Sequence, residues 1–359
     1  MKAKTILPLL LPVGGLSAFL LCFPGEMARG VRDGLTLCGA ALIPSLFPFF
    51  VLCSFVTRSG LAAASGVRAE RFMRKLFRLP GASFGAVLLG LCGGYPVGMR
   101  MTAQLYAQGR LTDDEAERMS LFCVCAGPAF VVGTVGASML GSRACGRILF
   151  TSLTLSALAV GLLLRFAAED GGSRAAAPVR PERLAHSLCA AVADAGEAML
   201  SVCAWVLLFS GVCAVTARLP DAAALPFRCL LEAANGCRAA AESGLPLPVF
   251  AAILGFGGLA VQCQVLPYAT SIGARLSRFW AFRAVAAALS ACFCIALLRV
   301  FPQAQPVLLV RGGAVLRPVS ASAPASAALL TAAAVFIWNG SAEKDENLHN
   351  FLKNVKKTT

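Results

Sequence analysis

The sequence has little charge, almost no histidine and none of the usual arrangements of catalytic or metal-binding residues. Only 14% of its 359 residues are charged, against roughly 25% in an ordinary soluble domain. Its two histidines, His186 and His349, lie near basic stretches, and its fifteen cysteines include no C-x-x-C pair. We find no Ser/His/Asp set, metal cluster or phosphate-binding loop. These absences argue against an enzyme, a zinc or redox site and a bound cofactor.

The positive charge lacks the pattern of a nucleic-acid interface. The chain has 32 Lys and Arg against 18 Asp and Glu, a formal net charge of +14. These basic residues are scattered over short loops, without the interleaved aromatic residues that single-strand binders use. We therefore expect no nucleic-acid partner and interpret the charge as a signal of membrane topology.

Hydrophobic residues make up 58% of the chain and fall into long runs, which predicts an integral membrane protein with the lipid bilayer as its surroundings. The expected fold is all-α and polytopic. Two shorter apolar pieces, 82–98 and 228–237, are broken by Gly, Pro or Asn and are predicted to be re-entrant. The predicted crossings, about eight in number, are 5–23 (a retained first span), 36–57, 118–140, 147–167, 193–217, 247–270, 283–301 and 320–338.

Loop charge predicts the orientation. Residues 58–78 carry six basic residues and one acid, and a second basic loop holds Arg275, Arg278 and Arg283; both are expected in the cytoplasm. The short loop with Arg143 and Arg147 does not fit this rule, because the same topology places that basic loop outside the cytoplasm. This arrangement predicts a multi-pass protein of the cell (inner) membrane with both termini in the cytoplasm.

The predicted topology makes the two halves inverted copies. Each half has a span, a broken re-entrant piece, a glycine-bearing span and a closing span, and an inverted repeat places a shared site between its halves. The expected organisation is a first span (1–27), repeat 1 (28–168), a cytoplasmic linker (169–184), inverted repeat 2 (185–301), a last span (302–338) and a disordered polar tail (339–359).

The first break is the run Gly93, Gly94, Tyr95, Pro96, Val97 and Gly98. Glycine permits backbone conformations closed to other residues, and Pro96 lacks an amide donor, so a helix must stop or kink here. Backbone groups freed in this way can bind an ion or a polar ligand. The alternative is that the glycines only allow close helix packing.

The next span adds a second irregularity at Gly127 and Pro128, which could instead be a simple proline kink. Before it, residues 112–115 (Thr-Asp-Asp-Glu) form a capping signature, so these acids are expected to cap a helix rather than to catalyse.

In the second half, Asn235 and Gly236 form a turn dipeptide inside an apolar stretch, three residues after Glu232. A carboxylate at membrane depth is costly and suggests cation or proton binding. Alternatively, Glu232 lies at the interface and pairs with Arg228. The span that follows has Gly257 and Gly258, then Gln262 and Gln264, of which at most one is expected to face the site because alternate helical positions diverge.

No metal site is expected. The candidate substrate-binding residues are Gly93, Gly94, Tyr95, Pro96, Gly98, Gly127, Pro128, Glu232, Asn235, Gly236, Gly257, Gly258, Gln262 and Gln264.

These residues also carry a resemblance. The chain resembles the YlbJ-type sporulation integral membrane proteins of the Gate (nucleoside-recognition) group over about residues 28–301. The resemblance implies an inner-membrane protein of spore formation that handles a small solute, nucleoside-like or ionic. The residues and segments that carry it are Leu46, Phe47, Pro48, Phe49, 94–98, 109–117, Gly127, Pro128, Leu230, Leu231, Glu232, Asn235, Gly236 and 256–259.

Two functions follow from these observations. The first is a small-solute transporter whose site lies between the two broken segments. The alternative is a non-transporting membrane scaffold for spore-envelope assembly, for which surface loops matter and the breaks do not. Whether the chain forms a homo-oligomer stays open.

Overall fold

The computed structural model describes residue 17 and residues 21–168 and 184–302, and every element in these ranges is a helix. The chain divides into two units, Met1–Val319 and Ser320–Thr359, and the described residues belong to the first. The predicted span 5–23 lies almost wholly outside the described residues. The linker 169–184 except Leu184, the last-span segment 302–338 except residue 302, and the tail 339–359 lie outside them as well.

Five described stretches are long and apolar enough to cross a membrane, which makes the chain a polytopic membrane protein. They confirm the predicted spans 36–57, 147–167, 193–217, 247–270 and 283–301. The predicted boundary at residue 28 falls inside the first of them. The five are α2 (Pro24–Leu37), π-helical η1 (Cys38–Leu42) and α3 (Ile43–Arg58) taken together; α8 (Arg143–Leu164) with η3 (Arg165–Ala167); α9 (Leu184–Val215); α12 (Leu247–Phe256) with α13 (Gly258–Ser271); and α14 (Leu276–Val300).

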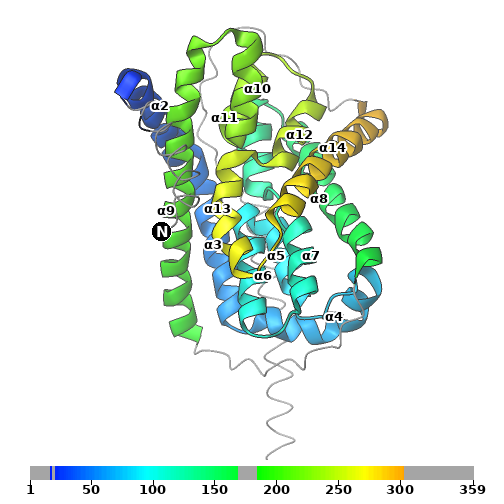
Figure 1. The fold of residues 1–359 in the computed structure, drawn as a ribbon. Coiled ribbons are helices and arrows are strands. Elements are labelled where there is room, and N and C mark those ends of the chain that lie inside the picture. Colours follow the sequence, from blue (N-terminus) through cyan, green and yellow to red (C-terminus); the bar gives the residue numbers. More distant parts are fainter. Residues whose placement is uncertain (1–16, 18–20, 169–183, 303–359) are drawn as a thin grey trace, which may run out of the picture. The chain divides into compact units, whose positions relative to one another are not determined.

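Both re-entrant candidates are helical hairpins. The first joins α5 (Ser83–Gly93) to α6 (Tyr95–Ala107), and the second joins α10 (Asp221–Leu231) to α11 (Ala233–Glu242). A Cβ built on Gly90 would lie 2.9 Å from the Cα of Gly98, although eight residues of straight helix span about 12 Å. Likewise, a Cβ on Gly236 would lie 2.7 Å from the Cα of Cys229. The chain therefore folds back at each break, and Figure 1 shows α5–α6 in the lower part of the view and α10–α11 in the upper part.

The predicted crossing 118–140 is wrong as a continuous helix. It consists of α7 (Asp113–Phe122), a non-helical stretch over 123–127, and π-helical η2 (Ala129–Met139). Pro128 cannot donate an amide hydrogen bond, so it opens the second piece rather than kinking one helix. At the start of α7, Thr112 and Glu115 form the predicted capping box.

Helices of residues 28–168 pack against helices of residues 185–301. Helix α3 lies along α9, and α8 lies along α14. The first hairpin contacts the second half through α6 and α13, and the second hairpin contacts the first half through α11 and η2. Amphipathic α4 (Leu61–Phe77) packs against α3 and α5, and the short η4 (Thr216–Arg218) follows α9. These contacts bring both hairpin breaks to one place.

Candidate solute-binding site

Each hairpin break lies directly against the break in the helix that follows it. In the first half, a Cβ on Gly127 would lie 3.0 Å from the amide nitrogen of Gly94. In the second half, a Cβ on Gly258 would lie 3.0 Å from the amide nitrogen of Ala233. Gly94 and Gly258 both have positive φ, 95° and 72°, a conformation that glycine adopts at no steric cost. The glycines therefore bring two irregular backbone segments into contact in each half.

Tyr95 joins the two halves at this point. Its hydroxyl donates to the carbonyl oxygen of Leu254 at 2.5 Å, and its ring lies against Gly257. Because α12 ends at Phe256, its last carbonyls lack the amide donors that a continuing helix would supply. The hydroxyl of the first hairpin thus satisfies a backbone acceptor that the break in the second half leaves free.

A cavity of about 50 Å³, which we call the central cavity, lies among these breaks. Both hairpins and the segment before η2 contribute to it, so its walls come from both halves. Polar side chains in the lining are those of Glu232, Gln264 and Tyr95, whose hydroxyl is bound to the Leu254 carbonyl; the rest is backbone and apolar side chains. The lining residues are Leu42, Leu46, Phe50, Gly93, Gly94, Tyr95, Pro96, Ala126, Gly127, Phe130, Val202, Val206, Glu232, Ala233, Ala234, Val261 and Gln264.

Glu232 is the only charged residue in that lining, and it is 3% exposed. It is the N-cap of α11: its carboxylate accepts from the amides of Ala234 at 3.0 Å and Asn235 at 2.7 Å. The side-chain amide of Asn235 also donates to it, at 2.9 Å. These donors and the positive end of the helix dipole stabilise a negative charge at a depth where an unsolvated carboxylate would be costly. The predicted alternative, a pair with Arg228, does not form, because Arg228 donates to Thr216 instead.

Gln264 supplies the second polar group. Its residue is 8% exposed, and none of the hydrogen bonds within the described residues involves its side-chain amide. A buried amide without a protein partner is costly unless water or a ligand satisfies it. Gln262, two residues earlier, does not line the cavity, as the divergence of alternate helical positions predicts.

A second cavity of about 50 Å³, the Asp194 cavity, adjoins the central one. The two share four lining residues, Phe50, Pro96, Val202 and Gln264. Asp194 of α9 accepts from Arg58 at 2.7 Å and lies 3.5 Å from Arg100. Sequence periodicity does not reveal this pairing, because Arg58 and Asp194 stand 136 positions apart.

A third cavity, which we call the vestibule, has a volume of about 420 Å³. Asn235 lines it and also binds Glu232 of the central cavity, so this one side chain lies between the two spaces. The residues lining the vestibule are Arg29, Gly30, Asp33, Ser210, Cys213, Ala214, Arg228, Asn235, Arg238, Ala239 and Glu242.

The candidate residues thus fall into three groups. Gly93, Gly94, Tyr95, Pro96, Gly127, Glu232 and Gln264 line the central cavity, and Asn235 lines the vestibule. The others, Gly98, Pro128, Gly236, Gly257, Gly258 and Gln262, line neither of these cavities. Among them Gly98 shows the alternative role clearly, since a Cβ there would lie 2.0 Å from the carbonyl oxygen of Cys123.

One basic residue lies far from its predicted place. Arg283 was expected in a cytoplasmic loop, but it lies within α14 and is 3% exposed. Its guanidinium donates to the carbonyls of Val124 at 2.5 Å and Leu121 at 2.8 Å. It therefore caps the free carbonyls at the end of α7, where a cation is favourable. The sequence contains a signal for this burial, because Arg283 stands inside the apolar run Trp-Ala-Phe-Arg-Ala-Val-Ala.

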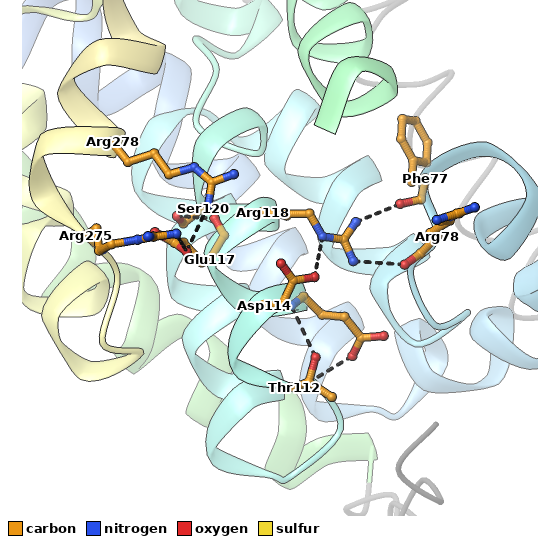
Figure 2. A network of polar contacts seen from close by, with 10 residues as sticks. Phe77, Arg78, Thr112, Asp114, Glu117, Arg118, Ser120, Arg275 and Arg278 are labelled. Carbon is orange, nitrogen blue, oxygen red and sulfur yellow. Dashed lines mark hydrogen bonds and ion pairs between the residues drawn. The ribbon is translucent and has the colours of Figure 1, made fainter. Parts of the chain in front are cut away.

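Helix α7 also links the two predicted basic loops at one end of the molecule. Figure 2 shows Arg118 reaching the carbonyls of Phe77 and Arg78, at 2.9 and 3.0 Å, with its Nε on Asp114. On the other side of the helix, Glu117 accepts from Arg275 and Arg278. Loops 58–78 and 272–275 therefore lie at the same end, as the charge pattern predicted.

Parts of the chain are similar in sequence to known proteins. Residues 40–143, which include the first hairpin, match the profile of the Gate family, described as "Nucleoside recognition". The chain is 32% identical over 150 residues to "Sporulation integral membrane protein YlbJ" of Bacillus subtilis (strain 168). That match covers 42% of this chain and 37% of the relative. No solved structure matches. The chain is thus a multi-pass membrane protein that is similar to the Gate family over residues 40–143 and, over part of its length, to a sporulation membrane protein.

Proposed function

We propose that this protein is a small-solute transporter of the cell membrane that acts during spore formation, with the central cavity as its site. The observation that carries the proposal is the meeting of two hairpin breaks around one cavity that contains Glu232 and Gln264. Irregular backbone at membrane depth is tolerated where it lines a cavity, and broken helices of this kind form transporter sites. The proposal includes no catalytic step and places both termini in the cytoplasm.

The proposal includes an inverted repeat, which the packing between helices supports. In the proposed correspondence α3, α5–α6, α7–η2 and α8 match α9, α10–α11, α12–α13 and α14. A two-fold axis relating the halves would pair α3 with α9 and α8 with α14, and would make α6 on α13 equivalent to α11 on η2. All four contacts occur. In such repeats the two halves move relative to each other around a fixed central site.

The size of the cavity favours a small cargo. At roughly 10–15 Å³ of such space for each water molecule, a cavity of about 50 Å³ holds a few waters or one small cation. A nucleoside would need the two halves to separate further. The Glu232 carboxylate and the Gln264 amide offer oxygen acceptors, which suit a cation or a small hydrogen-bond donor. We therefore propose a small polar solute or monovalent cation.

Uptake into proteoliposomes tests the proposal. The full chain is reconstituted and supplied with labelled rubidium, methylammonium or uridine. We expect uptake of rubidium or methylammonium and its loss by about tenfold or more in Gln264→Leu, which removes the unpaired amide. Gln262→Leu is the comparison, since it removes an amide from the same helix at a residue that does not line the cavity and donates to the Phe256 carbonyl at 3.4 Å. Equal uptake by the two variants would contradict the site, and uptake of uridine alone would overturn the cargo class.

The scaffold alternative is distinguished by spore formation. Substituting Gly94 or Asn235 by a bulkier residue should abolish a transporter's function while leaving membrane insertion intact. A scaffold would tolerate both changes and depend instead on exposed residues of the loop and helix over 58–78. Normal sporulation with both substitutions, in cells that rely on this chain, would favour the scaffold.

A further inference from the structure

The vestibule contains an arrangement of charge that the transport proposal does not use. Three of its lining residues are arginines from three different helices: Arg29 of α2, Arg228 of α10 and Arg238 of α11. Two carboxylates, Asp33 and Glu242, line the same space. Within the described residues, none of the three guanidiniums forms an ion pair with either acid. The arginines therefore face the cavity with their charge uncompensated by a direct partner.

Most donors of these arginines are also free. Arg228 uses its Nε on Thr216 at 3.0 Å, and Arg238 uses one Nη on the Asn235 side-chain oxygen at 2.9 Å. Arg29 makes no hydrogen bond within the described residues, and its charge interacts at longer range with Glu26 on the same helix. A guanidinium presents five N–H donors in a planar fork that matches the paired oxygens of carboxylate or phosphate. Thr216 holds the guanidinium of Arg228 in place, and Asn235 holds that of Arg238. These two side chains therefore lose less conformational freedom when a ligand binds.

We propose that the vestibule is a binding site for an oxyanion, the phosphate or carboxylate group of a solute or of a lipid headgroup. Its volume of about 420 Å³ lies within the range of small-molecule sites. The arginines supply charge-assisted hydrogen bonds, the strongest kind available for such a ligand. Asp33 and Glu242 reduce the excess of positive charge and disfavour a ligand that brings its negative charge close to them. The site does not depend on transport through the central cavity.

Binding of an oxyanion in the vestibule would affect the hydrogen bonds at the second hairpin break, between α10 and α11. Arg238 contacts Asn235, and Asn235 in turn donates to Ser210 at 2.8 Å and to Glu232 at 2.9 Å. An oxyanion that attracts the Arg238 guanidinium toward the vestibule would weaken the hydrogen bond between Arg238 and the side-chain oxygen of Asn235. The hairpin α10–α11 is therefore the element through which a bound anion would act.

The test uses the full chain in nanodiscs and inorganic phosphate as the probe, at constant ionic strength with chloride as the reference. In phosphatidylcholine discs we expect phosphate to raise the unfolding temperature, with a midpoint concentration that gives the dissociation constant. The double variant Arg29→Gln and Arg228→Gln should weaken this constant about tenfold or more. The matched control is Arg143→Gln with Arg147→Gln, which removes the same charge from exposed positions on α8.

A parallel series in discs containing phosphatidylglycerol identifies the source of the oxyanion. Stabilisation by phosphatidylglycerol that is lost in the Arg29/Arg228 variant, without an effect of free phosphate, supports the site with a lipid headgroup as its ligand. No stabilisation of the unmodified protein by either phosphate or phosphatidylglycerol overturns the proposal. Equal losses in the two double variants overturn it as well, because they would reflect net charge alone.

Discussion

Arg58 of α3 and Asp194 of α9 form a two-point ion pair, with Nε–Oδ2 and Nη2–Oδ1 distances of 2.7 and 3.1 Å. At the far end of the same pair of helices, Arg218, just after α9, binds Glu26 of α2. Each ion pair joins an arginine at the C-terminal end of one span to a carboxylate in the other. The antiparallel α2–α3 and α9 spans are therefore joined by an ion pair near each end.

Asp194→Asn should destabilise the protein by about 1–3 kcal/mol, because a partly buried Arg58 loses its charged acceptor. The measurement is thermal or denaturant unfolding of the purified protein. Glu197→Gln is the control: it removes the same charge from the same helix at an exposed position without a described partner. If both variants unfold like the unmodified protein, the ion pair contributes nothing to stability.

Tyr95→Phe should cost about 1–3 kcal/mol, since it leaves the Leu254 carbonyl without its hydroxyl donor at the junction of the two halves. Tyr268→Phe provides the comparison, because the Tyr268 hydroxyl has no hydrogen bond among the described residues and lines the Asp194 cavity. Unfolding of both variants in the same detergent measures the difference. A Tyr268 variant that loses as much stability as the Tyr95 variant would contradict the assignment.

The sequence alone located the first hairpin break closely, because glycine and proline interrupt an apolar run at Gly94 and such local signals can be read without a fold. It placed the second break wrongly: the predicted turn dipeptide Asn235–Gly236 lies inside α11, and the chain turns at Glu232. The partners of Asp194 and the place of Arg283 depend on contacts between residues more than a hundred positions apart, which periodicity cannot supply. The structure at Gly127 and Pro128 could be predicted only in part, because a proline in an apolar run indicates either a kink or a break. Arg283 favours the break, since it donates to carbonyls of α7 and of the segment after it.

Alanine in place of two glycines should have opposite effects. A Cβ on Gly98 would meet the Cys123 carbonyl at 2.0 Å, so Gly98→Ala must displace the first hairpin from the break that follows α7. We expect a loss of about 1–3 kcal/mol or more. A Cβ on Gly196 meets nothing within 4 Å, and there alanine should stabilise helix α9 by about 0.5–1 kcal/mol. A Gly98→Ala variant as stable as the unmodified protein would show that packing at Gly98 is not tight, and a destabilised Gly196→Ala variant would contradict the open space at that position.

The contact of Glu117 with α14 should make stability depend on pH in the acid range. Hydrogen bonds from Arg275, assisted by the charge of Arg278, lower the pKa of Glu117 from its usual value of 4.5. Because the pKa is lower in the folded state, ionised Glu117 stabilises that state above about pH 4.5, and this contribution is lost as the pH falls through the folded-state pKa. Unfolding temperatures measured between about pH 3 and pH 6 should therefore fall less steeply in Glu117→Gln than in the unmodified protein. Glu197→Gln should keep the original slope, and a Glu117 variant whose curve ran parallel to the unmodified one would show that this link between α7 and α14 is not made in solution.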